Sequence, residues 1–263
     1  MRLDEDQLDR YHRNGFLVMP ALFGAREIDA LRAAFAADSA LPGPHRIMEP
    51  GGTEVRSLYA SHRRRPEFAA LVRSPRLLEP ARQLVGSELY VYQFKINAKP
   101  AFGGDRWAWH QDFPAWQQAD NLRAPRLVNA ALFLDEVTEF NGPLLFVPGS
   151  HRAGSLGRRA GAGPGHLDPD DIAVGKAQLA TLVSAHGMTA PHGPAGSVVF
   201  FHPELVHGSA VNMSPFPRKL LLVTYNDVTN PPEPRGPARP DYLVGRDTTA
   251  LTTGGEPFAE ALA

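Results

Sequence analysis

Several stretches within about the first 85 residues have hydrophobic and polar positions that follow a helical period. Ile28, Leu31 and Phe35 recur on one face of a helix, while charged residues fall between them. Gly15 can end an earlier helix, and the apolar residues after it resemble a short strand. This region is therefore expected to hold helices at 4–14, around Ile28 and from Pro66 to about Val85, with a strand at 16–19.

Beyond this region the pattern changes to short apolar runs separated by turns. Asn141-Gly142 is a strong hairpin signal, and Pro148-Gly149-Ser150 ends another run with a turn. Such spacing is typical of antiparallel strands, which are predicted at residues 89–98, 127–133, 144–147, 197–201 and 220–225. A mainly β fold, with an antiparallel core and flanking helices, is therefore the expected class.

The chain is expected to form one domain over residues 1–263. Its parts would be a helical N-terminal region at about 1–85, a β core at about 86–228 and a C-terminal strap at 229–263. Residues 41–62 hold too many prolines and glycines for a helix and are expected to form a loop near the substrate. The glycine-rich segment 154–165 is predicted to be a mobile excursion or lid, and the proline-rich segment 230–240 a stiff surface strap.

Charge and cysteine content exclude several kinds of partner and site. The 27 basic and 28 acidic side chains nearly balance, so no overall field attracts nucleic acid or an anionic membrane, and a small molecule is the expected partner. Cysteine is absent, which leaves His, Asp and Glu as metal ligands. Because no apolar stretch is long enough for a signal sequence or a membrane span, a cytoplasmic location without membrane contact is predicted.

Three residues could together hold a metal ion. His110 and Asp112 are two apart in WAWHQDF, and on an extended strand this spacing places both side chains on one face. His207 follows the apolar strand predicted at 197–201, which could bring it beside the first pair. Two imidazoles and one carboxylate leave other positions on an iron ion free for a cosubstrate and dioxygen. Taken alone, each histidine is more typical of a hydrogen-bonded core residue.

A cation and a polar strand face extend this candidate site. Arg218 stands at the start of another apolar strand, where its guanidinium could clamp the distal carboxylate of a keto-acid cosubstrate. Gln93, Lys95 and Asn97 alternate with apolar residues, so one face of their strand is polar and suits the keto-acid end of that molecule. The alternatives are a surface cation for Arg218 and a solvated sheet face for the other three.

Several sequence blocks, in the same order, resemble the phytanoyl-CoA dioxygenase superfamily over nearly the whole chain. Similarity to the ectoine hydroxylase branch lies in YQFKINAKPAFGGDRWAWHQDFPAW, NGPLLFVPGSHR and VHGSAVNMSPFPR. Similarity to the leucine hydroxylase of the griselimycin pathway lies in GPHRIMEP, VRSLYASH, DEVTEFNGP and GRDTT. The resemblance implies a double-stranded β-helix (jelly-roll, cupin-like) core and a hydroxylase that uses Fe(II), 2-oxoglutarate and O2. Because related halogenases lack the carboxylate ligand, Asp112 favours hydroxylation.

The resemblance also implies roles for individual residues. His110, Asp112 and His207 match the iron ligands and would form the catalytic centre. Positions that surround 2-oxoglutarate or line the cavity beside it match Gln93, Lys95, Asn97, Trp107, Trp116, Ser209 and Arg218. The residues that follow Trp116 depart from the ectoine pattern, so ectoine itself is a poor substrate candidate.

The expected substrate is a free L-amino acid, leucine-like or lysine, in natural-product biosynthesis. Arg56 is the candidate carboxylate anchor, with Tyr59, His62 and Trp116 as further substrate contacts, although Arg56 could instead pair with Glu54 or another loop acid. An acidic cluster at 168–171 could receive a lysine ammonium or start a helix, and does not decide between the substrates. One alternative is a carrier- or CoA-bound substrate, for which Arg158-Arg159 is a weak candidate site for the CoA phosphates. The other is a non-catalytic cupin-like protein that binds a metal or ligand.

Overall fold

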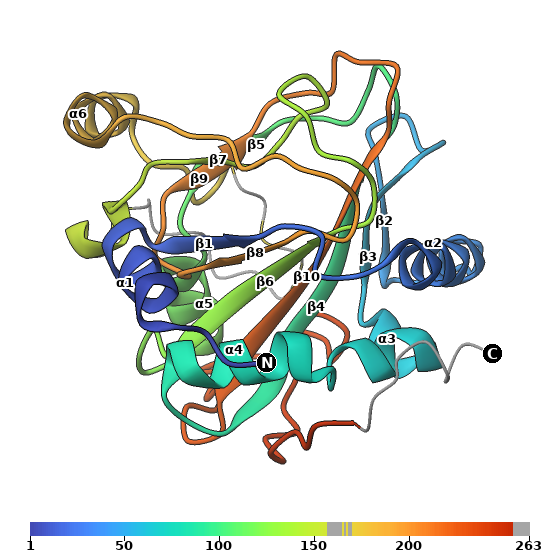
Figure 1. Ribbon diagram of the computed structural model, residues 1–263, viewed down its shortest axis with the longest axis horizontal. Coiled ribbons are helices and arrows are strands. Elements are labelled where there is room, and N and C mark those ends of the chain that lie inside the picture. Colours follow the sequence, from blue (N-terminus) through green and yellow to red (C-terminus); the bar gives the residue numbers. More distant parts are fainter. Residues whose placement is uncertain (157–164, 166, 168–169, 255–263) are drawn as a thin grey trace.

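Two antiparallel sheets form the centre of the computed structural model (Figure 1), which describes residues 1–156, 165, 167 and 170–254. The larger sheet has the strand order β1-β8-β6-β10-β4-β3-β2, and the smaller has the order β5-β9-β7. The strands are β1 (Phe16–Met19), β2 (Arg46–Met48), β3 (Val55–Tyr59), β4 (Leu89–Lys99), β5 (Trp107–His110), β6 (Leu127–Phe133), β7 (Leu145–Phe146), β8 (Val198–Phe201), β9 (His207–Ser209) and β10 (Arg218–Asp227). The helices are α1 (Glu5–Asn14), α2 (Ala25–Ser39), α3 (Pro66–Leu71), α4 (Pro75–Val85), α5 (Asp112–Asp120) and α6 (Lys176–His186), with short 3-10 turns η1 (Ser61–Arg63) and η2 (Ser150–Ala153).

Local signals set the ends of the N-terminal helices. The Asp4 side chain accepts a hydrogen bond from the Gln7 backbone N–H, and the Gln7 side chain accepts one from the Asp4 backbone N–H, which is a capping box that starts α1. Gly15 ends the same helix with a left-handed φ of 81°. The helix predicted from Pro66 to about Val85 is two helices, because Ser74 caps a new helix that has Pro75 in its first turn.

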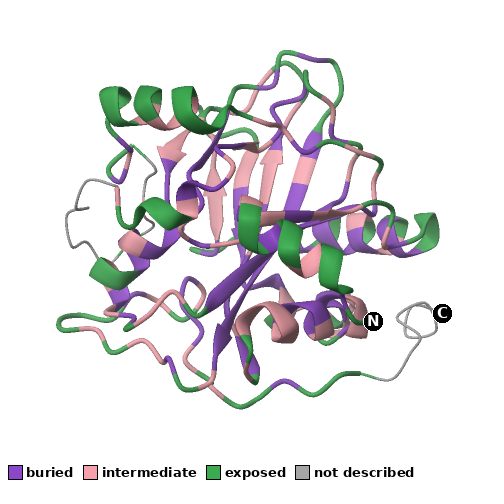
Figure 2. Cartoon of the chain, turned by 60° about the vertical axis from the view of Figure 1, so that its left-hand side comes forward, coloured by how far each residue is buried: buried purple, intermediate pink, exposed green. Residues whose placement is uncertain are grey.

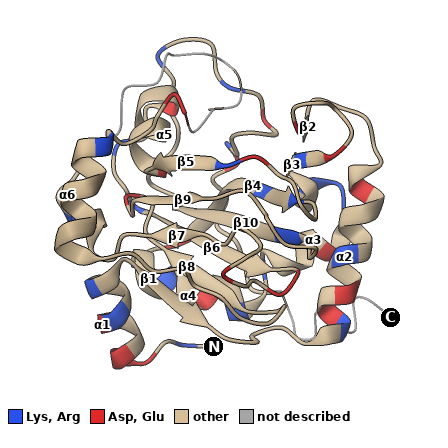
Figure 3. Ribbon diagram, turned by 90° about the horizontal axis from the view of Figure 1, so that it is seen from above, with Lys and Arg blue, Asp and Glu red and all other residues tan. Residues whose placement is uncertain are grey.

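Helices α1 to α4 lie over the outer face of the larger sheet (Figure 1). Ile28 and Leu31 from α2 belong to the same buried cluster as Phe94 and Ile96 from β4. In Figure 2 these helices are buried on the side toward the sheet and exposed on the other. Figure 3 shows charged residues of both signs on α1 and α2; on α1 the acidic residues stand in the first turn and basic residues in the last, as the helix dipole favours. The main core therefore lies between the helices and one face of the larger sheet.

The opposite face of the larger sheet looks toward the smaller sheet and carries the polar residues. Along β4, Phe94 and Ile96 face the helices, so Lys95 and Asn97 face the other way. Leu222 and Leu220 on β10 are their cross-strand partners on that inner face. The space between the sheets thus receives a mixed polar and apolar wall.

The expected class, an antiparallel β core with flanking helices, is confirmed. Residues 41–62 differ from expectation, because they contain β2, β3 and η1 and extend the larger sheet at its edge instead of forming a plain loop. Helix α6 was not predicted. Most of the glycine-rich segment 154–165 lies outside the described residues. Within the described part of the chain, no helix is long and apolar enough to cross a membrane.

Candidate active site

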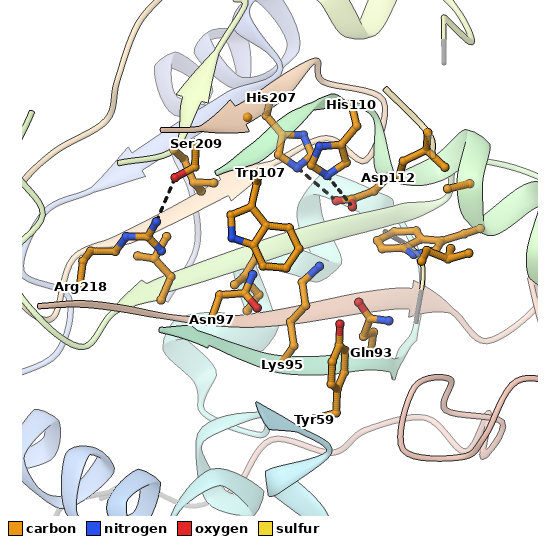
Figure 4. Close-up of a pocket in the computed structure, with 18 of the residues that line it drawn as sticks. Tyr59, Gln93, Lys95, Asn97, Trp107, His110, Asp112, His207, Ser209 and Arg218 are labelled. Carbon is orange, nitrogen blue, oxygen red and sulfur yellow. Dashed lines mark hydrogen bonds and ion pairs between the residues drawn. The ribbon is translucent and has the colours of Figure 1, made fainter. Parts of the chain in front are cut away.

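Three buried side chains meet between the two sheets (Figure 4). Strands β5 and β9 are paired so that His110 stands opposite His207, and Asp112 begins α5 beside them. The Nε2 atoms of the two histidines each lie 3.8 Å from an Asp112 oxygen, Oδ1 for His110 and Oδ2 for His207. One ligand atom from each of the three residues lies within 4.8 Å of the others. Among the described residues this is the one group of that kind.

The backbone brings His110 and Asp112 together in a way that differs from the predicted strand. Strand β5 ends at His110, and Asp112 is already the first residue of α5. Gln111 between them is still extended, with φ −119° and ψ 140°, so the alternation of side chains persists for one more residue. Its side chain also binds Gly154 O, Glu204 O and the Leu156 amide, which anchors this strand-to-helix junction.

Hydrogen bonds from outside the cavity orient the two imidazoles. His110 Nδ1 lies 2.6 Å from Ala108 O and His207 Nδ1 lies 2.9 Å from Leu205 O. Because a carbonyl oxygen only accepts, each Nδ1 carries the hydrogen and each Nε2 lone pair is left for a metal. Two imidazole nitrogens and a carboxylate are a donor set that suits iron(II).

Electrostatics place the three residues in the protonation states that metal binding requires. Burial, followed by the neighbouring His207, lowers the pKa of His110 to about 3. Burial alone would raise the pKa of Asp112, but Lys95, the two histidines and a hydrogen bond from Asn129 lower it overall. The imidazoles are therefore neutral and the carboxylate is ionised near neutral pH.

Arg218 lies at the other end of the same cavity and is 1 % exposed. Its Nη2 donates to Gly142 O and, at 3.1 Å, to Ser209 Oγ, while Ser209 Oγ donates to Gly142 O at 2.9 Å. Its Nε has no partner among the described residues. Burial lowers the pKa of Arg218 to about 9, so the guanidinium stays charged at neutral pH. The alternative of a surface cation at Arg218 is thus excluded.

The polar face of β4 lines the cavity between Arg218 and the three metal-site residues (Figure 4). Gln93 donates to Leu243 O at 2.9 Å, which leaves its amide oxygen on the cavity side, and Asn97 Oδ1 accepts from Ser57 at 2.8 Å. Lys95 extends toward Asp112, and burial lowers its pKa against the attraction of that carboxylate. These residues form a cavity wall and not a solvated sheet face.

The candidate substrate residues divide into two groups. Tyr59 and Trp116 line the cavity, as does Trp107. Arg56 lies outside the cavity, with its Nη1 3.1 Å from Glu49 Oε2 and its guanidinium carbon 4.3 Å from the centre of the Trp107 ring. It therefore pairs with a loop acid, which was the alternative to substrate binding, and that acid is Glu49 and not Glu54. His62 packs on Phe94, with ring centroids 5.1 Å apart.

The position of His62 has a simple cause. Phe94 belongs to the outer face of β4, because it alternates with the cavity residues Gln93 and Lys95. A side chain stacked on Phe94 is therefore on the far side of the sheet from the cavity. The structure brings neither Arg56 nor His62 to the cavity wall.

Arg239 is a cavity residue that the sequence pattern did not indicate. It belongs to the proline-rich segment expected to be a surface strap, yet it is 3 % exposed and lines the cavity. Asp120, at the end of α5, accepts from its Nε at 2.9 Å and from its Nη2, and Tyr92 donates to the same carboxylate. The expectation of a plain surface strap is wrong at this residue. An arginine within a run of prolines was the one available signal.

The remaining lining is apolar. It comprises Ala115, Leu144, Leu167, Ile172, Leu220 and Leu222. These side chains form the apolar wall of the cavity, in which Ala115 and Ile172 pack with Leu167, and Leu220 and Leu222 pack with Leu144.

Comparison with known proteins identifies the family. The model of the family described as phytanoyl-CoA dioxygenase (PhyH) matches residues 11–220. The chain is 40 % identical over 256 residues to the L-proline trans-4-hydroxylase of Streptomyces griseoviridis, covering 92 % of each protein. It is 36 % identical over 260 residues to the ectoine dioxygenase of Bordetella bronchiseptica, covering 93 % of this chain and 83 % of the relative.

Solved structures agree with these relatives. The crystal structure of EctD from S. alaskensis with 2-oxoglutarate and 5-hydroxyectoine superposes with a TM-score of 0.86 and 34 % identity, covering 97 % of this chain and 89 % of that one. The form of the same protein with bound Fe gives a TM-score of 0.85. The predicted jelly-roll fold and the predicted class of enzyme, a 2-oxoglutarate-dependent dioxygenase, are confirmed by these matches. The chain belongs to the phytanoyl-CoA dioxygenase family.

Proposed function

We propose that this protein hydroxylates an unactivated C–H bond of a free L-amino acid with an aliphatic side chain, with Fe(II) held by His110, Asp112 and His207. The observation that carries the proposal is the single cavity that joins these three residues to Arg218, Arg239 and an apolar wall. The predicted cofactors, iron, 2-oxoglutarate and O2, are confirmed by the donor set and by the relatives that bind them. A cytoplasmic location and a role in natural-product assembly stay predictions.

The residues of this chain divide the catalytic work among them. Bound iron with 2-oxoglutarate supplies the activation of dioxygen that C–H hydroxylation needs. Arg218 would bind the distal carboxylate of 2-oxoglutarate as a planar fork, with Ser209 holding the guanidinium. Lys95, Gln93 and Asn97 would contact the keto-acid end. The protein's main task is to hold one C–H bond close to the metal and to exclude water.

Arg239 is the best candidate anchor for the carboxylate of the amino acid. It is a buried cation in the cavity, and Asp120 and Tyr92 fix its orientation. Arg218 is assigned to the cosubstrate, and Arg56 is committed to Glu49 outside the cavity. Asp120 already pairs with Arg239, so a free substrate carboxylate would add a second anion to this guanidinium, and a thioester has no carboxylate to offer it.

The apolar wall favours an aliphatic side chain over lysine. Asp112 is the one carboxylate in the described cavity lining, and it is assigned to the metal. A lysine ammonium would therefore meet no free acid there. Asp170 pairs with Arg106 at 2.7 Å on the surface, while Asp168 lies outside the described residues. Relatives named for proline and ectoine also act on small molecules with apolar ring carbons, which is consistent with such a wall.

A mass-spectrometric screen tests the proposal. The enzyme is incubated with Fe(II), ascorbate and 2-oxoglutarate, and with each proteinogenic amino acid as the free acid, the amide and a thioester. We expect hydroxylation, with matching succinate, of one or a few aliphatic free acids, and none of their amides. Preferred turnover of a thioester would favour a carrier-bound substrate, and turnover of lysine alone would contradict the aliphatic assignment.

Substitution of Arg239 separates substrate binding from cosubstrate binding. Arg239→Gln should raise the KM for the amino acid at least about tenfold and leave the KM for 2-oxoglutarate unchanged, because the two carboxylates bind different arginines. Arg218→Gln is the matched control and should show the reverse pattern. Equal effects of both variants on both KM values would mean that the two sites are not separate.

A further inference from the structure

Two buried cations lie side by side on the larger sheet, and one of them, Arg218, lines the cavity. Arg218 on β10 is the cross-strand partner of Lys99 on β4, and each is 1 % exposed. Like charges directly opposite each other on neighbouring strands destabilise a sheet, and buried charges are ordinarily paired. Among the described residues, neither cation forms an ion pair with a carboxylate. A sheet that keeps two such cations together is suited to an anion that binds there.

The surroundings of Lys99 are built around its side chain. Its Nζ donates to Asp105 O at 2.8 Å and to Ala210 O, so it ties the loop after β4 to the end of β9. A Cβ atom on Gly104 would lie 2.8 Å from the Lys99 stem, and one on Gly142 would lie 3.0 Å from it. Both glycines have positive φ, and their missing side chains leave the space that the lysine occupies.

Lys99 acts on the cavity through Arg218 and its partners. It does not line the cavity itself, but Ala210 is joined directly to Ser209, which accepts a hydrogen bond from Arg218. Lys99 thus fixes the backbone next to Ser209, and its charge is close enough to Arg218 for the guanidinium to lower the pKa of the lysine.

We propose that Lys99 is a positioning residue for the dicarboxylate cosubstrate. The buried charge of Lys99 favours binding of the distal carboxylate at Arg218, and Lys99 takes up a proton when that carboxylate binds. The proposal rests on the proposed assignment of Arg218 to 2-oxoglutarate. It makes the affinity for 2-oxoglutarate dependent on pH through a group outside the metal site.

The charges around Lys99 give the direction of this dependence. Burial, followed by the charges of Arg218 and Arg56, lowers the pKa of Lys99 to about 7, although Glu49 and Asp105 act in the opposite direction. A carboxylate bound at Arg218 adds a negative charge and raises the pKa of Lys99. Binding therefore takes up a proton where free Lys99 is partly neutral, and the affinity for 2-oxoglutarate falls as pH rises through about 7 and above.

Isothermal titration calorimetry of 2-oxoglutarate into the anaerobic Fe(II)-loaded enzyme measures both effects. Titrations in buffers of different ionisation enthalpy give the number of protons exchanged, which should be an uptake of about half a proton at pH 7 and more at pH 8. Lys99→Met should lose the uptake and weaken binding about tenfold, the size of one charge interaction at short range. Lys99→Arg should keep the affinity, without uptake and without the change between pH 7 and 8.

The outcomes separate this inference from the assignment of the cosubstrate site. Wild-type affinity and proton uptake in Lys99→Met would overturn the role of Lys99, while loss of binding in Arg218→Gln would still support the site. Unchanged binding in Arg218→Gln would overturn the site itself. If Lys99→Met loses affinity and Lys99→Arg loses it equally, the lysine is only a packing element and the charge proposal is wrong.

Discussion

Each metal-site residue is oriented by a hydrogen bond to a group that lies outside the cavity. The carbonyl oxygens of Ala108 and Leu205 hold the two imidazoles, and Asn129 donates to Asp112 Oδ2 at 2.9 Å. Asn129 is itself oriented, because its Oδ1 accepts from Thr224 at 2.7 Å. The carboxylate is thus held by a chain of two hydrogen bonds across β6 and β10.

Replacement of Asn129 tests how much this orientation contributes to metal binding. Asn129→Ala removes the hydrogen bond from the Asn129 side chain to Asp112 and should lower the affinity for Fe(II) about 10- to 100-fold, as measured by anaerobic metal titration. Thr224→Val, which removes only the outer bond, should have a smaller effect. Wild-type affinity in Asn129→Ala would show that the carboxylate needs no support from β6.

Single residues also show where sequence reasoning succeeded. The site residues close to one another in the sequence, such as His110 and Asp112, were predictable because backbone geometry alone relates them. Arg239 was not, because its place in the cavity depends on a pairing with Asp120, which lies 119 residues away. For Arg56 the sequence indicated an acidic loop residue as an ion-pair partner but could not identify it, because Glu49 comes close to Arg56 only when β2 and β3 pair.

At the scale of elements, the predicted strands agree closely with the observed ones. Alternation identified the polar face of β4, and the β6 prediction has the observed bounds of Leu127–Phe133. Helix α6 was missed because Leu179, Leu182 and Val183 are interspersed with small residues and are only partly buried against a minor cluster. The start of α5 at Asp112 was missed because no capping side chain marks it.

The turn at Gly142 links the fold to the proposed cosubstrate site at Arg218. Gly142 has φ +73°, its carbonyl accepts from Arg218 and Ser209, and a Cβ would lie 2.8 Å from Ala210 O. Gly142→Ala should therefore cost more than about 1 kcal/mol of stability and raise the KM for 2-oxoglutarate. Gly86→Ala is the matched control, because Gly86 has φ +76° with nothing within 4 Å of a Cβ.

Chemical denaturation measures the stability of both variants, and steady-state kinetics measure their KM for 2-oxoglutarate. Gly86→Ala should lose about 1 kcal/mol from backbone strain alone and keep the wild-type KM. If Gly142→Ala loses the same unfolding free energy and also keeps the wild-type KM for 2-oxoglutarate, the contact between this turn and Arg218 does not contribute to cosubstrate binding.

At the scale of the whole molecule, buried neutral histidines limit stability in acid. Burial lowers the pKa of His62 to about 3 and of His202 to about 4, whereas an unfolded chain binds these protons near pH 6.5. A pKa that is lower in the folded state gives stability that is complete above pH 6.5 and is lost as pH falls. Each such histidine should cost about 1.4 kcal/mol per pH unit below that value.

His62 allows this to be measured away from the metal site. His62→Phe keeps a ring against Phe94 but cannot titrate. Between pH 7 and pH 5 the unfolding free energy of the metal-free variant, from urea denaturation, should fall about 2 kcal/mol less than that of the wild type. Equal falls would mean that His62 is protonated in the folded protein.

The central claim is that His110, Asp112 and His207 hold the iron with which 2-oxoglutarate oxidation is coupled to hydroxylation of a free amino acid. The most direct test measures succinate and hydroxylated amino acid in the same reaction, for the best substrate found and for Asp112→Ala. The account predicts equal amounts of the two products from the wild type and neither above background from the variant. Hydroxylated product without succinate, or undiminished formation of both by Asp112→Ala, would contradict it.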